Sequence, residues 1–118
     1  MIYEMKKLSR EILLAFWKAH ILHHASEGPV VGNWIIKELW RHGYEVSPGT
    51  LYPLLQRMEA NGWLRCEVDS KGGLRARRRY YATKKGAMVL ETVRKQIEQL
   101  YDEVCAGSSG QSSSAKGK

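Results

Sequence analysis

The sequence predicts a mainly α-helical α+β fold of the winged helix-turn-helix type, with three helices, a two-stranded β-wing and a C-terminal dimerisation helix. Two observations favour this fold. Apolar residues recur at helical spacing in three segments before Asn61, and from Trp63 the pattern changes to strand-like alternation. The second predicted strand is also strongly basic, which is typical of a wing that touches DNA.

The first two helices are expected over residues 8–26 and 32–42. Ser9 is a suitable N-cap for the first helix, and the Gly-Pro pair after Glu27 ends it. Gly43 stands where a left-handed C-cap ends the second helix. The apolar stripes are Ile12, Phe16 or Trp17, Ile21 and Leu22 on the first helix, and Ile35, Ile36, Leu39 and Trp40 on the second.

The third helix is expected from Ser47 to Ala60, although it contains two prolines and a glycine. Ser47 can cap it, and Pro48 fits the first helical position, where a missing N–H costs nothing. Gly49 has no Cβ, so another backbone can approach the start of the helix. Pro53 would meet the carbonyl group of Gly49 in an ideal helix, and a loose first turn is expected to accommodate its ring. The inward face is Leu51, Leu54, Leu55 and Met58.

The wing and the last helix follow. Alternation over residues 63–68 predicts one strand, the glycine-rich residues 69–73 predict a turn, and residues 77–82 predict the returning strand. Thr83 can cap a last helix whose apolar residues are three or four positions apart. This stripe needs a partner surface, and it is the predicted dimer interface: Val93, Ile97, Leu100 and Val104.

A chain of 118 residues suffices for one small domain. No stretch resembles a signal peptide or a membrane span, and the two cysteines have no disulfide or metal spacing, so we expect a cytoplasmic protein without cofactors or a membrane partner. No nucleophile with a base, phosphate loop or paired carboxylates is evident, which argues against an enzyme. The expected organisation is a winged-helix domain over residues 8–83, a dimerisation helix over 84–105 and a disordered tail over 106–118.

The net charge of +7 is concentrated in one segment. Residues 71–85 contain seven basic side chains and no acidic one, so the rest of the chain is neutral overall. A neutral body with one basic arm favours a polyanionic partner, and from charge alone DNA, RNA and an anionic membrane are all candidates. The winged-helix order of the elements favours double-stranded DNA among them.

The outward face of the third helix supplies further candidates. Gln56 can read a base edge, Tyr52 can contact a phosphate or a thymine methyl, and Arg57 can bind phosphate. The alternative is that Tyr52 packs against the wing and Gln56 is solvated. The predicted DNA-binding residues are Ser47, Gly49, Thr50, Tyr52, Gln56 and Arg57 on the helix, with Lys71, Arg75, Arg77 and Arg78 on the wing.

The pattern Ser-Pro-Gly-Thr-Leu-Tyr-Pro-Leu-Leu, which begins at Ser47, is long and idiosyncratic. Together with its flanks, residues 43–64, it closely resembles the recognition region of the PadR family of bacterial transcriptional regulators. Residues 27–32 resemble the first turn of that family and residues 75–86 its wing strand. The resemblance covers about residues 8–104.

The resemblance implies a homodimeric repressor that binds an inverted-repeat operator and is released by an effector or a stress signal. It also implies that the C-terminal helices pair with those of the partner and that the first helix helps to form the dimer centre. An aromatic effector pocket there would use Phe16, Trp17, His20 and Trp40, although ordinary core and interface burial explains these residues equally well.

Two other functions remain open. His20 and His24 lie four residues apart on the first helix and make a metal-responsive regulator conceivable. No acidic or thiol ligand is adjacent to them, so such a site is expected to need another helix or a second subunit, and no metal is predicted. The other function is a winged-helix module that binds protein and no DNA, against which the basic wing argues.

Overall fold

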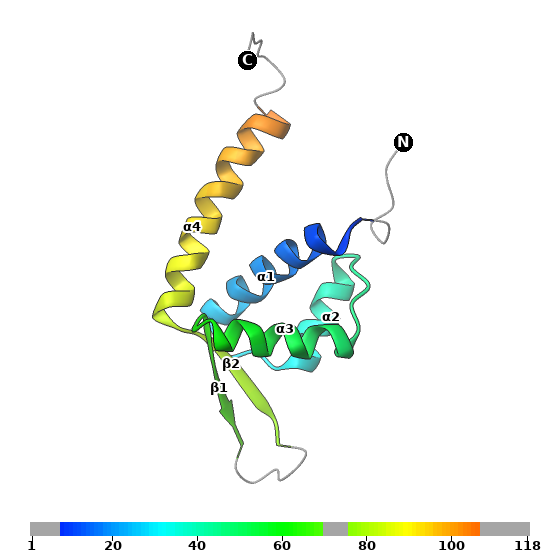
Figure 1. The fold of residues 1–118 in the computed structure, drawn as a ribbon, viewed down its shortest axis with the longest axis vertical. Helices are drawn as coiled ribbons and strands as arrows, with labels where there is room; N and C mark the ends of the chain where they lie inside the picture. Colours follow the sequence, from blue (N-terminus) through cyan, green and yellow to red (C-terminus); the bar gives the residue numbers. More distant parts are fainter. Residues whose placement is uncertain (1–7, 70–75, 107–118) are drawn as a thin grey trace.

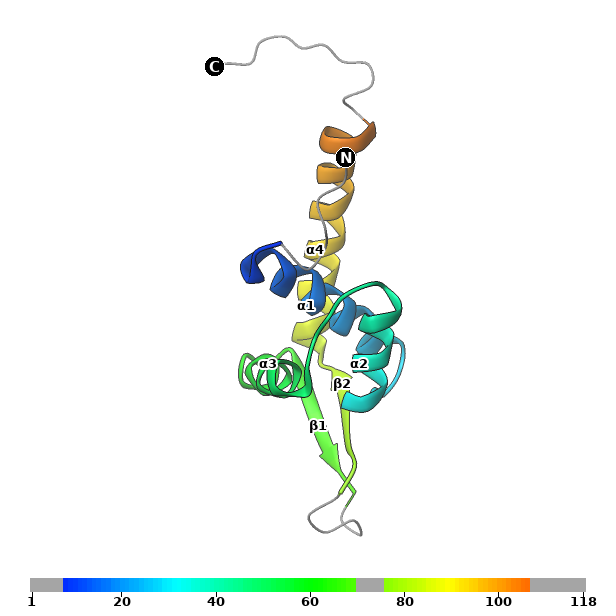
Figure 2. The same cartoon turned by 90° about the vertical axis from the view of Figure 1, so that its right-hand side faces the viewer.

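The computed structural model describes residues 8–69 and 76–106. Three helices form a compact body, the wing projects from one end of it, and the last helix extends away from the wing (Figures 1 and 2). This arrangement confirms the predicted fold class. In chain order the elements are α1 (Arg10–Glu27), α2 (Gly32–Arg41), α3 (Pro48–Ala60), β1 (Leu64–Val68), β2 (Arg78–Ala82) and α4 (Lys84–Tyr101), which ends in a π-helical turn at Asp102–Ala106.

Side-chain caps begin three of the helices, as the sequence predicts. The hydroxyl oxygen of Ser9 accepts a hydrogen bond from the Ile12 N–H at 3.4 Å, and that of Ser47 accepts one from the Thr50 N–H at 3.3 Å. The Thr83 hydroxyl caps α4 in the same way. These bonds satisfy N–H groups that have no partner within the helix. The helix α3 runs without a break through Pro53, which lies on its exposed side.

The core lies where α1, α2 and α3 meet the root of the wing. The inward face of α3 is fully buried, as predicted, together with Ile21, Leu39 and Leu64. The sequence left Phe16 or Trp17 as the core residue of α1. Trp17 is buried, whereas Phe16 and Ile12 are each 48% exposed. The stripe on α1 is wider than this core needs, so part of it stays on the surface.

Trp40 also lies at the surface, with 52% of its area exposed, although it belongs to the predicted stripe of α2. Its indole N–H donates to the Val46 carbonyl oxygen at 2.9 Å. This bond ties the end of α2 to the turn that leads into α3. In that turn Gly43 has a φ of 93°, so the expected left-handed C-cap is confirmed.

The two strands of the wing are antiparallel, with Cys66 opposite Tyr80. Val30, in the link between α1 and α2, extends this sheet at its root. Its N–H donates to the Tyr80 carbonyl oxygen at 3.0 Å, and the Tyr80 N–H donates back to the Val30 carbonyl oxygen at 2.8 Å. The burial of β1 fades toward its outer end, where Val68 is 49% exposed because the body no longer covers it.

A single junction joins α3, the wing and α4. The Thr83 hydroxyl donates to the Gly62 carbonyl oxygen at 2.5 Å and accepts from the Gly86 N–H at 2.9 Å. The Thr83 N–H donates to the Trp63 carbonyl oxygen at 3.0 Å. A Cβ on Gly86 would collide with that same carbonyl group, so α4 can begin here only because residue 86 has no side chain.

Replacing Gly86 by alanine is expected to destabilise the domain by about 1 to 3 kcal/mol, the usual cost of forcing a methyl group into a packed site. Urea unfolding followed by circular dichroism measures this change. Gly49→Ala is the matched control, because a Cβ at Gly49 meets only the Ser47 hydroxyl, at 3.8 Å. Equal stability of the two variants would contradict the dependence of α4 on the close contact with Trp63.

Candidate nucleic-acid interface

The exposed face of α3 combines small residues with two larger polar side chains. Gly49, Pro53 and Ala60 leave much of this face without long side chains, and Tyr52 and Gln56 lie beside them on the exposed side. A helix with so little bulk can come close to a flat or grooved partner. The space over Gly49 is open, because a Cβ at that residue would have only the Ser47 hydroxyl within 4 Å.

Tyr52 is held by the start of α2. Its ring lies directly on Gly32, so close that a Cβ at residue 32 would overlap the ring edge and come within 2.8 Å of the hydroxyl oxygen. The side chain remains 38% exposed. The sequence left two alternatives for Tyr52, a contact with DNA or packing on the wing, and the observed contact is with α2. The exposed part of the ring stays free for a partner.

A hollow of about 540 Å³ lies between the start of α2, the outward face of α3 and the base of β2. We call it the interface hollow. It brings together four of the predicted DNA-binding residues, which come from two segments more than twenty positions apart in sequence. The lining consists of Val31, Gly32, Asn33, Tyr52, Gln56, Ala76, Arg77, Arg78 and Tyr80.

Asn33 is a lining residue that the sequence pattern did not predict. It is exposed in the first turn of α2, and the N-cap residue, Val31, makes no side-chain cap with that turn. Free N–H groups at a helix start favour an anion, and an asparagine amide can donate beside them. The uncapped sequence Val31-Gly32-Asn33 was the available signal, but its position next to Tyr52 depends on the tertiary fold.

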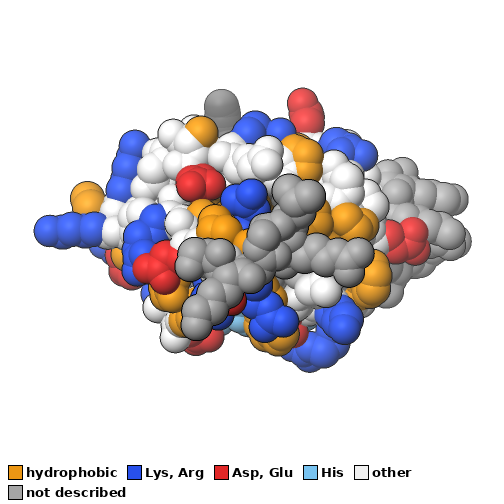
Figure 3. Space-filling model, turned by 90° about the horizontal axis from the view of Figure 1, so that it is seen from below, with side chains coloured by type: hydrophobic (Ala, Val, Ile, Leu, Met, Phe, Trp, Pro, Cys, Tyr) orange, Lys and Arg blue, Asp and Glu red, His pale blue; other side chains and the backbone are white. Residues whose placement is uncertain are grey.

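The charge of the wing lies mainly on and beside β2. On β1, Arg65 and Glu67 pair with each other, and the Arg65 guanidinium holds the pKa of the Glu67 carboxyl below its ordinary value. Arg77 and Arg78 are exposed and form no ion pair with any residue that the structure describes. The guanidinium groups of Arg77 and Arg78 are therefore available to an external anion. Basic side chains also surround much of the face seen from the wing end (Figure 3).

Tyr80 is the residue of β2 whose side chain is buried in the core of the domain. It is only 3% exposed, and burial raises the pKa of its hydroxyl to about 12. The hydroxyl therefore stays neutral at physiological pH. The Tyr80 side chain therefore adds no negative charge next to the arginines of the wing.

Several predicted residues lie outside the interface hollow. Ser47, Gly49 and Thr50 form the start of α3, with Ser47 engaged in its cap. Arg57 is exposed one turn from the end of α3. Lys71 and Arg75 lie outside the described residues.

Among the main pockets of the described residues, none is lined by more than one of the predicted effector residues. Trp17 is in the core, where its indole N–H finds no acceptor among the described residues. His20 lies against His42, with ring centroids 4.8 Å apart, and Trp40 lines a separate surface pocket beside the turn before α3. The effector pocket stays a prediction.

Three of the predicted dimer residues lie on α4, and the fourth, Val104, lies in the π-helical turn that follows it. Val93 is half-buried in the groove between α1 and α4, whereas Ile97, Leu100 and Val104 are between 52% and 61% exposed. In both ribbon views this half of α4 stands clear of the body (Figures 1 and 2).

Comparison with known proteins places these features in a wider group. The family described as "Transcriptional regulator PadR-like family" matches residues 21–92, from the second half of α1 to the middle of α4. A curated relative, transcriptional regulator Rv3488 of Mycobacterium tuberculosis, is 50% identical over 100 residues, which are 85% of this chain and 92% of the relative.

Solved structures agree with this match. A PadR family transcriptional regulator from Eggerthella lenta is 34% identical, with a TM-score of 0.66 over 80% of this chain and 86% of its own. A PadR-like transcriptional regulator from Bacillus cereus is 26% identical, with a TM-score of 0.73 over 86% of this chain and 99% of its own.

The Gly32→Ala substitution is expected to displace the Tyr52 ring, because the added methyl group would occupy the space of the ring edge. NMR spectra of the chain with isotope-labelled tyrosine should show the Tyr52 ring signals shifted or broadened. Lys37→Ala, an exposed change on the same helix, is the control and should leave these signals in place. Unchanged Tyr52 signals in Gly32→Ala would contradict the contact between Tyr52 and Gly32.

Proposed function

The chain belongs to the PadR-like family of transcriptional regulators, and from this premise we propose that it is a homodimeric repressor that binds an inverted-repeat operator and is released by an effector. In the proposed complex α3 enters the major groove, and the wing contacts the phosphate backbone beside it. Gln56 reads a base edge, while Arg77, Arg78 and Asn33 bind phosphates.

One observation carries the proposal: the interface hollow gathers Tyr52, Gln56, Arg77 and Arg78 on one side of the molecule. A base-reading amide and two guanidinium groups that form no ion pair with the described residues suit a ligand that presents bases and phosphates together. Residues 71–85 contain seven basic side chains and no acidic one, and this concentration of a single charge favours a polyanion such as DNA over a protein partner.

The exposed stripe on α4 supports a dimer. Ile97, Leu100 and Val104 offer an apolar surface that an isolated chain would leave in water, and a second copy of the same helix can cover it. A two-fold axis near α4 and α1 would present two α3 helices about 34 Å apart, which is one turn of DNA. An inverted-repeat operator is the matching target.

The other expectations follow from the same premise. The family members that match this chain are named as transcriptional regulators rather than enzymes. None of the helices that the structure describes is long and apolar enough to cross a membrane. We propose a cytoplasmic regulator that meets DNA directly.

Changing Arg77 and Arg78 together to alanine is expected to weaken binding to every duplex, by about tenfold or more at low salt, and to flatten the dependence of affinity on salt. Fluorescence anisotropy with an operator and a scrambled duplex measures both effects, after selection from a random library has supplied the operator. Gln56→Ala should instead reduce the difference between the two duplexes.

The charge-matched control is Arg94→Ala with Lys95→Ala, on the part of α4 that points away from the wing. It should leave the affinity for DNA close to that of the wild type. If the wild-type affinity does not change between low and physiological salt, the proposed phosphate contacts are absent.

Ile97→Asp is expected to convert the dimer to a monomer, because the carboxylate would be buried against an apolar helix face. Light scattering after size exclusion gives the mass directly. Lys95→Asp, on the opposite side of α4, should remain a dimer. A dimeric Ile97→Asp variant would move the interface away from this stripe.

A further inference from the structure

All four histidines of the chain lie in one cluster, where the end of α1 meets α2. His20, His23 and His24 come from α1, and His42 follows the last residue of α2. The ring centroids of His23 and His24 are 4.8 Å apart, as are those of His20 and His42. No histidine lines the interface hollow, so this cluster has no part in the DNA-binding surface described above.

Within this cluster we propose a binding site for a divalent transition-metal ion of the zinc type, formed by His23, His24 and Glu27. One ligand atom from each residue lies within 4.8 Å of the other two. The pair His20 and His24, which the sequence suggested, is different: their rings stack face to face with centroids 6.5 Å apart, so their edges do not converge on one point. Glu27 is an acidic ligand that the sequence pattern did not predict.

The donor set matches the chemistry of such an ion. Two imidazoles and one carboxylate form a common three-residue zinc set that leaves a fourth position for water. The ligand atoms of a tetrahedral ion with bonds of about 2 Å lie about 3.3 Å apart, so the widest separation in this set, which is at most 4.8 Å, has to shorten by up to about 1.5 Å. The side chains of His23 and Glu27 are 45% and 63% exposed, with 3.6 Å between Nε2 and Oε2, so they are free to make this movement.

His24 is the fixed member of the set. Its side chain is 17% exposed, and its Nε2 lies 3.5 Å from an oxygen of Glu38. Its ring packs edge to face against the Trp34 ring, with 5.1 Å between the ring centroids. A carboxylate behind one ring nitrogen orients a histidine and leaves the other nitrogen for a metal. Glu38 itself is engaged by both Arg41 nitrogens, at 2.7 and 3.1 Å, which makes it a support for the site rather than a ligand.

The position at the end of a helix adds to the attraction. His24 and Glu27 occupy the last turn of α1 and His23 directly precedes it, and the carbonyl groups without helical partners at this end carry partial negative charge. A cation is stabilised there. The same end of α1 borders a pocket of about 380 Å³ that reaches the wing.

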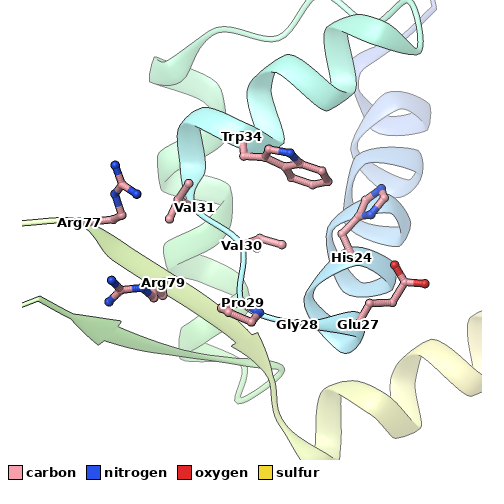
Figure 4. A pocket seen from close by; sticks show the side chains of 9 residues that line it. All are labelled: His24, Glu27, Gly28, Pro29, Val30, Val31, Trp34, Arg77 and Arg79. Atoms are coloured by element: carbon pink, nitrogen blue, oxygen red, sulfur yellow. The ribbon is translucent and has the colours of Figure 1, made fainter.

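That pocket connects the proposed site with the basic strand. His24, Glu27 and Trp34 lie on one side of it, and Arg77 and Arg79 lie on the other (Figure 4). Val31 and Arg77 line both this pocket and the interface hollow. Moreover, only Gly28 and Pro29 separate Glu27 from Val30, whose backbone pairs with Tyr80 in the wing.

An ion that draws Glu27 toward the two histidines would therefore pull on the segment that holds the wing. The direction of the effect on DNA rests on the proposed function, in which an effector releases the repressor: metal binding lowers the affinity for the operator. By linkage, operator binding lowers the affinity for the metal by the same factor.

The binding test uses the tag-free, EDTA-treated full chain without DNA. Calorimetric titration with Zn²⁺ should give one ion per chain with a micromolar dissociation constant, and Co²⁺ should give the visible absorption of a site with nitrogen and oxygen ligands. His23→Ala and Glu27→Gln are each expected to weaken Zn²⁺ binding by at least about tenfold. Glu11→Gln is the control, because it makes the same change at an exposed residue in the first turn of α1, at the end opposite to the site.

Wild-type Zn²⁺ affinity in His23→Ala and Glu27→Gln would overturn the site, as would equal weakening by Glu11→Gln. Thermal melting by circular dichroism verifies that each variant is folded. A second titration compares operator affinity with and without Zn²⁺, and at least about a fivefold loss is expected in the wild type and none in Glu27→Gln. Zn²⁺ binding without this loss would overturn the link to the wing, whereas failure of the metal-free chain to bind DNA would overturn the proposed function and leave the metal titration valid.

Discussion

The architecture depends on the hydrogen bonds of one side chain, Thr83. Its hydroxyl group links the Gly62 carbonyl, just after α3, to the Gly86 N–H in the first turn of α4, and both strands of the wing lie between these two points. Because a hydroxyl group can donate and accept at once, one residue fixes the root of the wing and the direction of α4. The helix that bears the proposed dimer stripe and the surface proposed to meet DNA are thus set in a defined relation.

Local features of the sequence were sufficient to predict most of the elements. Caps such as Ser47 and Thr83, and the turn at Gly43, depend on interactions within four residues, so their residue types identify them. The buried face of α3 follows from its spacing alone. The choice between Phe16 and Trp17 was different, because it depends on which side of α1 the other helices cover.

Features that join distant segments could not be predicted from the sequence. The pairing of Val30 with Tyr80 and the contact of Tyr52 with Gly32 each bridge twenty residues or more. Asn33 enters the interface hollow only because of that second contact. Glu27 differs from these features because the sequence did contain a local signal for it. It stands four residues after His23 and three after His24 on the same helix, and the prediction considered only the spacing of His20 and His24.

The bridge between Val30 and Tyr80 has a consequence for the dynamics of the domain. Two amide hydrogens, one on each residue, are held by a contact between the body and the wing rather than by the ladder of the hairpin. They exchange with solvent only when the wing root separates from the body or when the whole domain unfolds. The difference between their opening free energy and that of the α3 core amides therefore gives the energetic cost of detaching the wing by itself.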